Sequence, residues 1–339
     1  MSARRNRIAG SIMSQSLVFV DDSLPGITRR KVRSHWAYFD AHGERITNRE
    51  EIDRLNAVGL PPAYADAWFA PRPDAHILAT GIDARGRKQY RYHPDFTAER
   101  ASLKFDRCVA FGHALPRIRA RVEKDMGSRL LSRERAIASV VYLLDSGRIR
   151  IGNEAYARTN RSFGATTLRM RHAKLAGGKL MLRFRAKSGK LCEIGMTDRR
   201  LIRFVKRMQD LPGQHLFQHL REDGDAAPIT SSDVNGYIQE TMGADFTAKQ
   251  FRIWRASSLA LEWLADDANG PGINAMLAFV SEHLCNTPAV ARKAYVHPRL
   301  LDLAKAGREA RREAIRLPRR TRWLSRPERG LIALLESGD

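Results

Sequence analysis

The sequence has few cysteines and no long apolar stretch. Its three cysteines, Cys108, Cys192 and Cys285, are isolated, and none has the Cys or His spacing of a zinc site. We expect them to be reduced thiols, because disulfides are rare in cytosolic proteins. The longest apolar stretch, residues 136–144, contains a serine and a tyrosine and is far shorter than the roughly 18 residues that a membrane-spanning helix requires. These absences predict a cytoplasmic protein without disulfides, structural zinc or a membrane span.

Two signatures of nucleotide and metal chemistry are also absent. The sequence has no glycine-rich phosphate-binding loop followed by Lys and Ser or Thr, which ATP hydrolysis would require. It also has no grouped set of aspartates and glutamates suited to magnesium. We therefore expect no metal, no nucleotide and no other cofactor.

Positive charge is what the sequence has in excess. Its 339 residues include 59 Lys and Arg but only 37 Asp and Glu, which gives a formal net charge of +22 at pH 7. A hydrophobic content of 43% is sufficient for folded cores, and the length suits two domains. Such an excess on a folded protein is typical of nucleic-acid binding. A merely soluble basic protein and a protein of the membrane surface are the alternatives.

Residues 30–97 have the pattern of a small domain of β-strands. Strand-forming segments lie around Tyr38 and over residues 77–80 and 87–92, and residues typical of turns separate them. The preceding residues 1–29 are basic, and we expect them to form a disordered arm.

The last of these strands carries basic and aromatic side chains at alternate positions. Because successive side chains of a strand point to opposite faces, its Lys and two Tyr residues share one face, and its two Arg and one Gln share the other. Such a strand can bind phosphates and base edges; an ordinary exposed strand with two packing tyrosines is the alternative. The candidate DNA contacts are Arg87, Lys88, Gln89, Tyr90, Arg91 and Tyr92.

Residues 98–302 change to the periodicity of helices. Ser132 is a suitable N-cap for a helix over residues 133–145, and apolar residues at helical spacing predict another helix over residues 273–284. Residues 303–339 are predicted to form a basic helical extension. Together with the strand-rich first domain, this second, mainly helical domain predicts an α+β fold.

Two β-hairpins are expected within the helical domain. Leu180, Leu182 and Phe184 alternate along a strand that follows a Gly-Gly turn. A second turn over residues 187–190 then leads to another apolar segment, which places Lys187 at the turn.

A tyrosine stands near basic residues at the end of a short predicted helix. Thr287 is a suitable N-cap, and Pro288 suits the first helical position, which places Tyr295 two turns further on. A phenol with a pKa near 10 becomes a useful nucleophile only where its surroundings stabilise negative charge. Tyr295 is therefore a candidate nucleophile, and a tyrosine that only packs near a helix end is the alternative.

Four segments of the helical domain stand out together: residues 148–153, 184–190, 249–252 and 286–295. In this order they resemble those of the type IB DNA topoisomerases, specifically the compact bacterial and poxviral branch. The resemblance extends to the first domain, at residues 60–64 and 81–94, and covers roughly residues 30–300. It implies an antiparallel β-rich domain and a mainly helical catalytic domain that together form a C-shaped clamp on double-stranded DNA.

The resemblance implies a role for each of five residues. Tyr295 attacks a phosphodiester and holds the 3′ phosphate covalently. Arg150 and Arg252 bind the nonbridging oxygens, and Lys187 protonates the departing 5′ oxygen. Asn286 stands where many relatives have a histidine that hydrogen-bonds a phosphate oxygen; an amide can donate the same bond but carries no charge.

The chemistry of phosphoryl transfer requires the same kinds of residue, independently of the resemblance. A phosphoryl transition state spreads negative charge over its oxygens, and two guanidinium groups can stabilise that charge where other enzymes use metal ions. A positioned acid should accelerate departure of the basic 5′ oxygen by on the order of 10²–10⁴-fold. Neighbouring basic residues could be mistaken for the chosen ones; these are Arg148, Lys190, Arg255 and Lys293.

The resulting hypothesis is an enzyme that nicks one DNA strand, lets the free end rotate, and reseals it without ATP, acting as a monomer on the nucleoid. A tyrosine recombinase uses similar chemistry, but its second arginine usually follows a histidine by three residues, and here Lys249 holds that place. A DNA-packaging protein without enzymatic activity would explain the net charge but would have no use for Tyr295.

Overall fold

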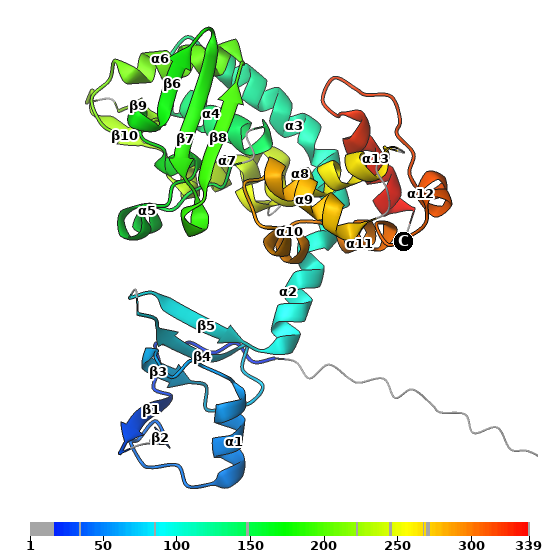
Figure 1. The fold of residues 1–339 in the computed structure, drawn as a ribbon. Coiled ribbons are helices and arrows are strands. Elements are labelled where there is room, and N and C mark those ends of the chain that lie inside the picture. Colours follow the sequence, from blue (N-terminus) through cyan, green and yellow to red (C-terminus); the bar gives the residue numbers. More distant parts are fainter. Residues whose placement is uncertain are drawn as a thin grey trace, which may run out of the picture. The chain divides into compact units, whose positions relative to one another are not determined.

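The computed structural model describes residues 17–337 apart from residues 34, 85, 147–148, 222, 244–245, 267 and 269–271, and apart from the side chains of residues 99–103 and 188. Contacts divide the chain into two compact units, Met1–Lys104 and Phe105–Asp339, here called the N-terminal and C-terminal units (Figure 1). The division falls within helix α2 (Pro94–Asp106). From the sequence, the change between the domains was predicted at residue 98.

The N-terminal unit is an antiparallel five-stranded sheet with helix α1 and most of α2, which confirms the prediction of a β-rich domain. The strands follow the order β2-β1-β3-β4-β5, so β5 lies at an edge. Helix α1 (Arg49–Ala57) begins at Asn48, whose side chain accepts a hydrogen bond from the Glu51 N–H. The strands are β1 (Ile27–Val32), β2 (His35–Phe39), β3 (Ala65–Phe69), β4 (Ile77–Ile82) and β5 (Lys88–Tyr92).

Part of the expected N-terminal arm belongs to this unit. Val18 forms a bridge with Ala75, and its N–H donates to the Asp74 carbonyl at 2.9 Å. Residues 1–16 of the arm lie outside the described residues.

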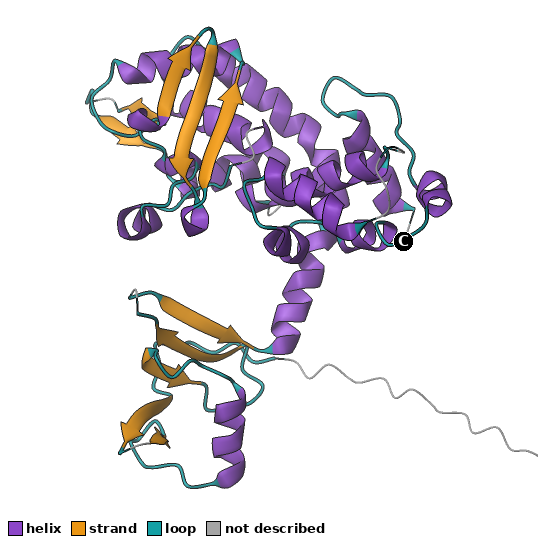
Figure 2. Ribbon diagram, in the orientation of Figure 1, coloured by secondary structure: helices purple, strands orange, loops and turns teal. Residues whose placement is uncertain are grey.

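The C-terminal unit is mainly helical, as predicted (Figure 2). Helix α8 lies at its centre, contacts α3, α4, α9 and α13, and buries the large side chains of Phe251 and Trp254. The helices are α3 (Cys108–Gly127), α4 (Arg133–Ser146), α5 (Glu154–Asn160), α6 (Arg199–Gln209), α7 (Ser231–Met242), α8 (Ala248–Leu264), α9 (Ile273–His283), α10 (Pro288–Ala294), α11 (Pro298–Leu303), α12 (Arg308–Ala314) and α13 (Arg326–Glu336).

A three-stranded antiparallel sheet packs on these helices and confirms the predicted hairpins. It consists of β6 (Ala173–Ala176), β7 (Lys179–Arg185) and β8 (Leu191–Met196). Leu180, Leu182 and Phe184 are buried, as their alternation predicted. The turn between β7 and β8 is a single 3₁₀ turn, η3 (Lys187–Gly189), in which Gly189 has a φ of +75° that favours glycine. A shorter hairpin, β9 (Gln218–Leu220) and β10 (Ala226–Pro228), lies elsewhere in this unit.

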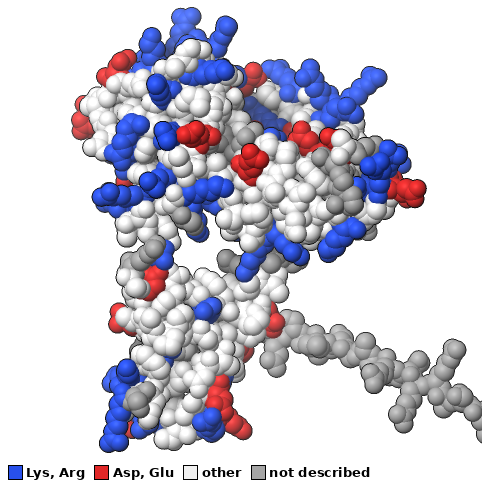
Figure 3. All heavy atoms as spheres, in the orientation of Figure 1, with Lys and Arg blue, Asp and Glu red and all other residues white. Residues whose placement is uncertain are grey.

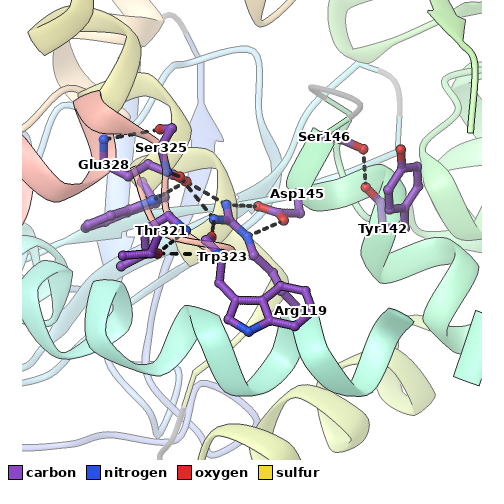
Figure 4. Close-up of polar contacts among 10 residues, drawn as sticks. Arg119, Tyr142, Asp145, Ser146, Thr321, Trp323, Ser325 and Glu328 are labelled. Carbon is purple, nitrogen blue, oxygen red and sulfur yellow. Dashed lines mark hydrogen bonds and ion pairs between the residues drawn. The ribbon is translucent and has the colours of Figure 1, made fainter. Parts of the chain in front are cut away.

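The end of the chain packs into the C-terminal unit through a partly buried arginine (Figure 4). Arg119 of α3 donates to Asp145 of α4 at 2.8 and 2.9 Å and to Glu328 of α13 at 2.6 and 3.0 Å. Trp254 of α8 donates its indole N–H to Glu328 at 3.0 Å. One carboxylate thus joins α3, α8 and α13.

Replacing Glu328 by glutamine should change how stability depends on pH. Burial raises the pKa of Glu328, but the hydrogen bonds and charge of Arg119 outweigh it and lower the pKa to about 2, against an ordinary 4.5. The ionised carboxyl therefore stabilises the fold above pH 4.5, by about 3 kcal/mol at most, and this stabilisation is lost as the pH falls towards 2. Urea unfolding should show a lower free energy of unfolding for Glu328→Gln than for wild type near neutral pH, and this difference should become smaller in acid. A difference that does not change with pH would contradict the prediction.

Candidate active site

Tyr295 stands at the C-terminal end of α10. The helix begins as predicted: the Thr287 side chain accepts a hydrogen bond from the Val290 N–H, and Pro288 occupies the first turn. Tyr295 follows the last helical residue and donates its own N–H to the Ala291 carbonyl at 3.0 Å. Its side chain therefore leaves from the end of a two-turn helix.

A serine of α8 fixes the backbone on both sides of this position. The Ser257 hydroxyl donates to the carbonyl of Tyr295 at 3.3 Å and accepts from the N–H of His297 at 3.1 Å. Ser257 is fully buried, and Val296 between the two bonded residues is also fully buried. The tyrosine is thus held against the central helix of the unit.

Arg252, on the same helix, faces the tyrosine ring. It lies one turn after the N-cap Thr247, and its guanidinium carbon is 5.0 Å from the centre of the Tyr295 ring. The side chain is only 4% exposed and donates to the Leu284 carbonyl at 2.9 Å. A neutral carbonyl thus orients this arginine without cancelling its charge.

Arg150 is positioned by a close backbone contact. Its carbonyl accepts from the Ala165 N–H at 2.7 Å. A Cβ added to Gly164 would lie 2.6 Å from that carbonyl oxygen and 2.5 Å from the Gly152 nitrogen, and Gly152 itself has a φ of +96°. Two glycines therefore allow the segment that carries Arg150 to lie directly on its neighbour.

Asn286 joins the elements of the site. Its side-chain oxygen accepts from Arg150, and its main-chain oxygen accepts from the Lys190 ammonium at 2.7 Å. Because arginine can only donate, the side-chain atom of Asn286 that faces Arg150 must be the oxygen. The other terminal atom is therefore the amide nitrogen. That nitrogen is buried and has no hydrogen-bond partner in the described part of the chain. This amide nitrogen can therefore donate to an acceptor atom of a bound ligand.

Lys187 is exposed on the β7–β8 turn and faces a cavity that Arg150 also lines. The cavity has a volume of about 260 Å³. Its walls are Arg150, Ile151, Gly152, Asn153, Tyr156, Ser162, Phe163 and Lys187. An elongated anion could therefore lie between the lysine and the arginine.

The charges of the site act on the tyrosine. Burial raises the pKa of Tyr295, but the positive charges of Arg252 and Arg150 and hydrogen bonds from both outweigh burial, so the pKa lies below its ordinary value of 10. The pKa of Arg252 is lowered by burial and by the charge of Arg150. The two arginines therefore repel each other and favour an anion between them.

The structure thus brings Arg150, Arg252, Asn286 and Tyr295 together, with Lys187 and Lys190 on the neighbouring turn. Arg148 lies outside the described residues. Sequence reasoning missed Ser257, because a serine inside a helix carries no pattern that distinguishes a tertiary hydrogen bond. The described residues contain no group of three or more His, Cys, Asp or Glu that could hold a metal ion. None of the described helices is both long and apolar enough to cross a membrane.

The candidate DNA contacts on β5 have two different environments. Tyr90 and Tyr92 are 42% and 46% exposed, and their rings stack at 5.8 Å with an angle of 10°. Several of the polar residues already have partners: Arg87 and Gln89 bind Asp83 at 2.6 and 2.9 Å, Lys88 binds Asp22 at 2.7 Å, and Arg91 donates to the Gly59 carbonyl at 3.0 Å. Both rings, Lys88 and Arg91 are exposed on this strand, and Gln89 is partly buried.

Comparisons with known proteins agree across both units. The family described as the catalytic core of eukaryotic DNA topoisomerase I matches residues 93–306, and the N-terminal domain of bacterial DNA topoisomerase IB matches residues 35–83. A relative named DNA topoisomerase 1B, from Acanthamoeba polyphaga mimivirus, is 31% identical over 294 residues, which cover 83% of this chain and 88% of the relative.

Two neighbouring serines give a matched test of how Tyr295 is held. Ser257→Ala leaves the Tyr295 carbonyl and the His297 N–H without their partner, and we expect it to lower the free energy of unfolding by about 1–3 kcal/mol. Ser258 is equally buried, but its hydroxyl has no hydrogen-bond partner among the described residues. Ser258→Ala should therefore be nearly neutral in the same denaturation experiment, and equal losses for both variants would contradict the assignment.

Proposed function

Because the chain belongs to the type IB DNA topoisomerases, we propose that Tyr295 is its nucleophile and that Arg150, Arg252, Asn286 and Lys187 complete the catalytic set. In this proposal, the protein relaxes supercoiled duplex DNA: it nicks one strand, lets the free end rotate, and reseals the strand. The observation that carries the assignment is the phenol of Tyr295 between two guanidinium groups, which donate hydrogen bonds to the Asn286 side-chain oxygen and to the Leu284 carbonyl.

The first step exchanges one phosphate ester for another. The Tyr295 oxygen forms a bond to phosphorus, and the bond between phosphorus and the 5′ oxygen breaks. The lowered pKa of Tyr295 makes loss of its proton easier at neutral pH. Because the phosphotyrosyl ester retains the energy of the broken phosphodiester, the reverse step reseals the strand without ATP.

Three donors are proposed to stabilise the transition state. Arg150 and Arg252 bind the nonbridging oxygens, on which negative charge accumulates. The free amide nitrogen of Asn286 supplies a further hydrogen bond. Since two fixed guanidinium groups provide the positive charge, the reaction proposed here requires no metal ion.

Lys187 is proposed as the general acid, since it lines the same cavity as Arg150. It gives a proton to the 5′ oxygen during cleavage and takes one back during resealing. Lys190 is the nearest alternative, but its ammonium already donates to the Asn286 carbonyl. We therefore assign Lys190 to holding the Asn286 segment.

Outside the catalytic set, β5 is proposed to bind the duplex. Stacked, exposed Tyr90 and Tyr92 offer flat apolar surface, and Lys88 lies 5.7 Å from the Tyr90 ring. Arg87, Gln89 and Arg91 would contact phosphates by exchanging their present partners for DNA oxygens. Both units are thus proposed to contact double-stranded DNA, with the protein acting as a monomer on the nucleoid.

Relaxation of a supercoiled plasmid tests the function. Wild-type protein should relax both negative and positive supercoils in chelator without nucleotide, and Tyr295→Phe should bind DNA equally well but relax none, because it lacks only the phenol oxygen. Denaturing wild-type protein during the reaction should trap DNA on the peptide that contains Tyr295. A requirement for magnesium or ATP, or attachment at another tyrosine, would contradict the proposal.

A substrate with sulfur in place of the bridging 5′ oxygen tests the acid. Lys187→Ala should slow cleavage of ordinary DNA by about 10²–10⁴-fold, because the 5′ oxygen then leaves without its proton. A thiolate needs little proton assistance, so the sulfur substrate should restore most of the rate of this variant. Single-turnover cleavage measures both rates.

The controls for this test are Lys190→Ala and Arg252→Ala. Arg252→Ala should recover much less with the sulfur substrate, since it still lacks charge stabilisation of the nonbridging oxygens. If Lys190→Ala is rescued and Lys187→Ala is not, the acid is Lys190.

A further inference from the structure

Two of the three cysteines meet next to the candidate active site. Cys192 is a buried residue of β8, and Cys285 is a partly buried residue directly after Leu284, the C-cap of α9. Their thiols share a hydrogen bond, and the positive charges of Arg150 and Arg252 reach Cys192. The fold thus brings two thiols from distant parts of the sequence together beside the arginines proposed to bind phosphate.

Cys285 stands between the two neutral acceptors that orient these arginines. The Leu284 carbonyl accepts from Arg252 at 2.9 Å, and the Asn286 side chain accepts from Arg150. Cys285 itself has a φ of +50°, in the left-handed region that residues other than glycine seldom adopt and that persists only where the surroundings fix it. Because Cys285 is joined covalently to both neighbours, a shift of its backbone moves both acceptors.

A second contact holds the same two segments together. Lys190 directly precedes β8, and its ammonium donates to the main-chain oxygen of Asn286 at 2.7 Å. Cys192 and Cys285 make their hydrogen bond two residues further along β8 and one residue earlier in the other segment. The start of β8 therefore already lies against the segment after α9, so little movement is needed to join the two sulfurs.

The two thiols differ in how easily they ionise. The hydrogen bond with Cys285, burial and the charge of Cys285 raise the pKa of Cys192 and outweigh the opposite effect of Arg150 and Arg252. Cys285 is therefore the thiol that loses its proton first. Positive surroundings favour a thiolate, and Figure 3 shows more Lys and Arg than Asp and Glu side chains on one face of this unit. The thiolate is the form of cysteine that reacts with oxidants, and Cys285 is also the more accessible of the two.

We propose that Cys192 and Cys285 are an oxidation site for peroxides, which convert the two thiols reversibly into a disulfide and thereby slow DNA cleavage. Cys285 reacts with the peroxide, and the buried Cys192 then closes the bond. The effect on cleavage rests on the catalytic roles proposed above, whereas formation of the disulfide does not.

The oxidation proceeds in two steps. With hydrogen peroxide, the Cys285 sulfur bonds to one oxygen as the O–O bond breaks, and the hydroxide released takes up a proton and leaves as water. The Cys192 sulfur then bonds to the Cys285 sulfur as the S–O bond breaks, and the departing hydroxide takes the proton of Cys192 to give a second water. The two thiols lose two electrons in all, and the peroxide gains them. A reduced dithiol reverses the reaction by thiol–disulfide exchange.

The disulfide is expected to disturb the two guanidinium groups. Its sulfurs lie about 2 Å apart, closer than two thiols that share a hydrogen bond, so the Cys285 backbone must shift towards β8. The Leu284 carbonyl and the Asn286 amide shift with it, and Arg252 and Arg150 lose their present orientation. A misplacement of about 1 Å in an active site can slow a reaction by roughly 100-fold.

The test treats the reduced wild-type protein with hydrogen peroxide and removes the excess. Thiol titration in denaturant should find three free thiols before treatment and one after it, and peptide mapping without reductant should find Cys192 joined to Cys285. Plasmid relaxation should slow by roughly 100-fold and should recover when dithiothreitol is added.

Cys192→Ala is the decisive variant, because it removes the thiol that closes the bond. It should relax DNA at the rate of the reduced wild-type protein both before and after treatment with peroxide, and Cys285→Ser should do the same if the first variant fails to fold. Cys108→Ala is the matched control, since it removes the remaining cysteine, on α3. This variant should still form the disulfide and lose activity.

Three free thiols after treatment, or a disulfide that includes Cys108 or joins two protein molecules, would overturn the proposal. So would a disulfide between Cys192 and Cys285 that leaves relaxation unchanged, or equal slowing of Cys192→Ala by peroxide. If the reduced wild-type protein relaxes no DNA, the proposed function is refuted, and the disulfide is still decided by the thiol count and the peptide map.

Discussion

The site depends on two guanidinium groups that are held close together although they repel each other. Arg252 is buried, and both its burial and the charge of Arg150 lower its pKa. Two neutral acceptors orient these groups: Arg150 donates to the Asn286 amide oxygen and Arg252 to the Leu284 carbonyl. A neutral acceptor fixes the direction of a cation and leaves its charge available, so in the proposed mechanism the site is prepared for a phosphate before DNA binds.

Another arginine of the same unit, Arg119, is paired with carboxylates instead of neutral acceptors. Arg119 is also largely enclosed, with 19% of its side chain exposed. Burial lowers its pKa, but Asp145 and Glu328 surround the guanidinium and together raise the pKa above its ordinary value. Its charge is neutralised inside the fold, and its role is to join helices. The type of acceptor, more than burial, separates arginines that hold the fold together from those that await an anion.

Local patterns in the sequence were sufficient to predict the elements of the site. The Thr287 cap and the alternation of Leu180, Leu182 and Phe184 follow from rules that act over a few residues. The resemblance to the topoisomerase family assigned these separate elements to one catalytic site. The packing of α13 onto α8 was not predicted, because a basic, charged segment reads as a solvated tail unless its buried leucines are matched to a partner surface.

Contacts between distant segments were the other part that the sequence did not reveal. Ser257, the pairing of Gly152 with Gly164, and the role of Asn286 as a link between Arg150 and Lys190 each join segments far apart in the chain. A single sequence carries no record of such pairs. The ion pair between Lys88 of β5 and Asp22 was missed for the same reason.

The most direct test of the account is the ionisation of Tyr295 itself, measured by NMR on protein with ¹³C at the phenol carbon of tyrosine. Comparison with Tyr295→Phe identifies the resonance. If the two guanidinium groups stabilise the phenolate, Tyr295 titrates below the ordinary pKa of 10, and Arg150→Ala and Arg252→Ala each raise this pKa. A Tyr295 resonance that titrates at or above 10 in wild-type protein, or that does not respond to loss of either arginine, would contradict it.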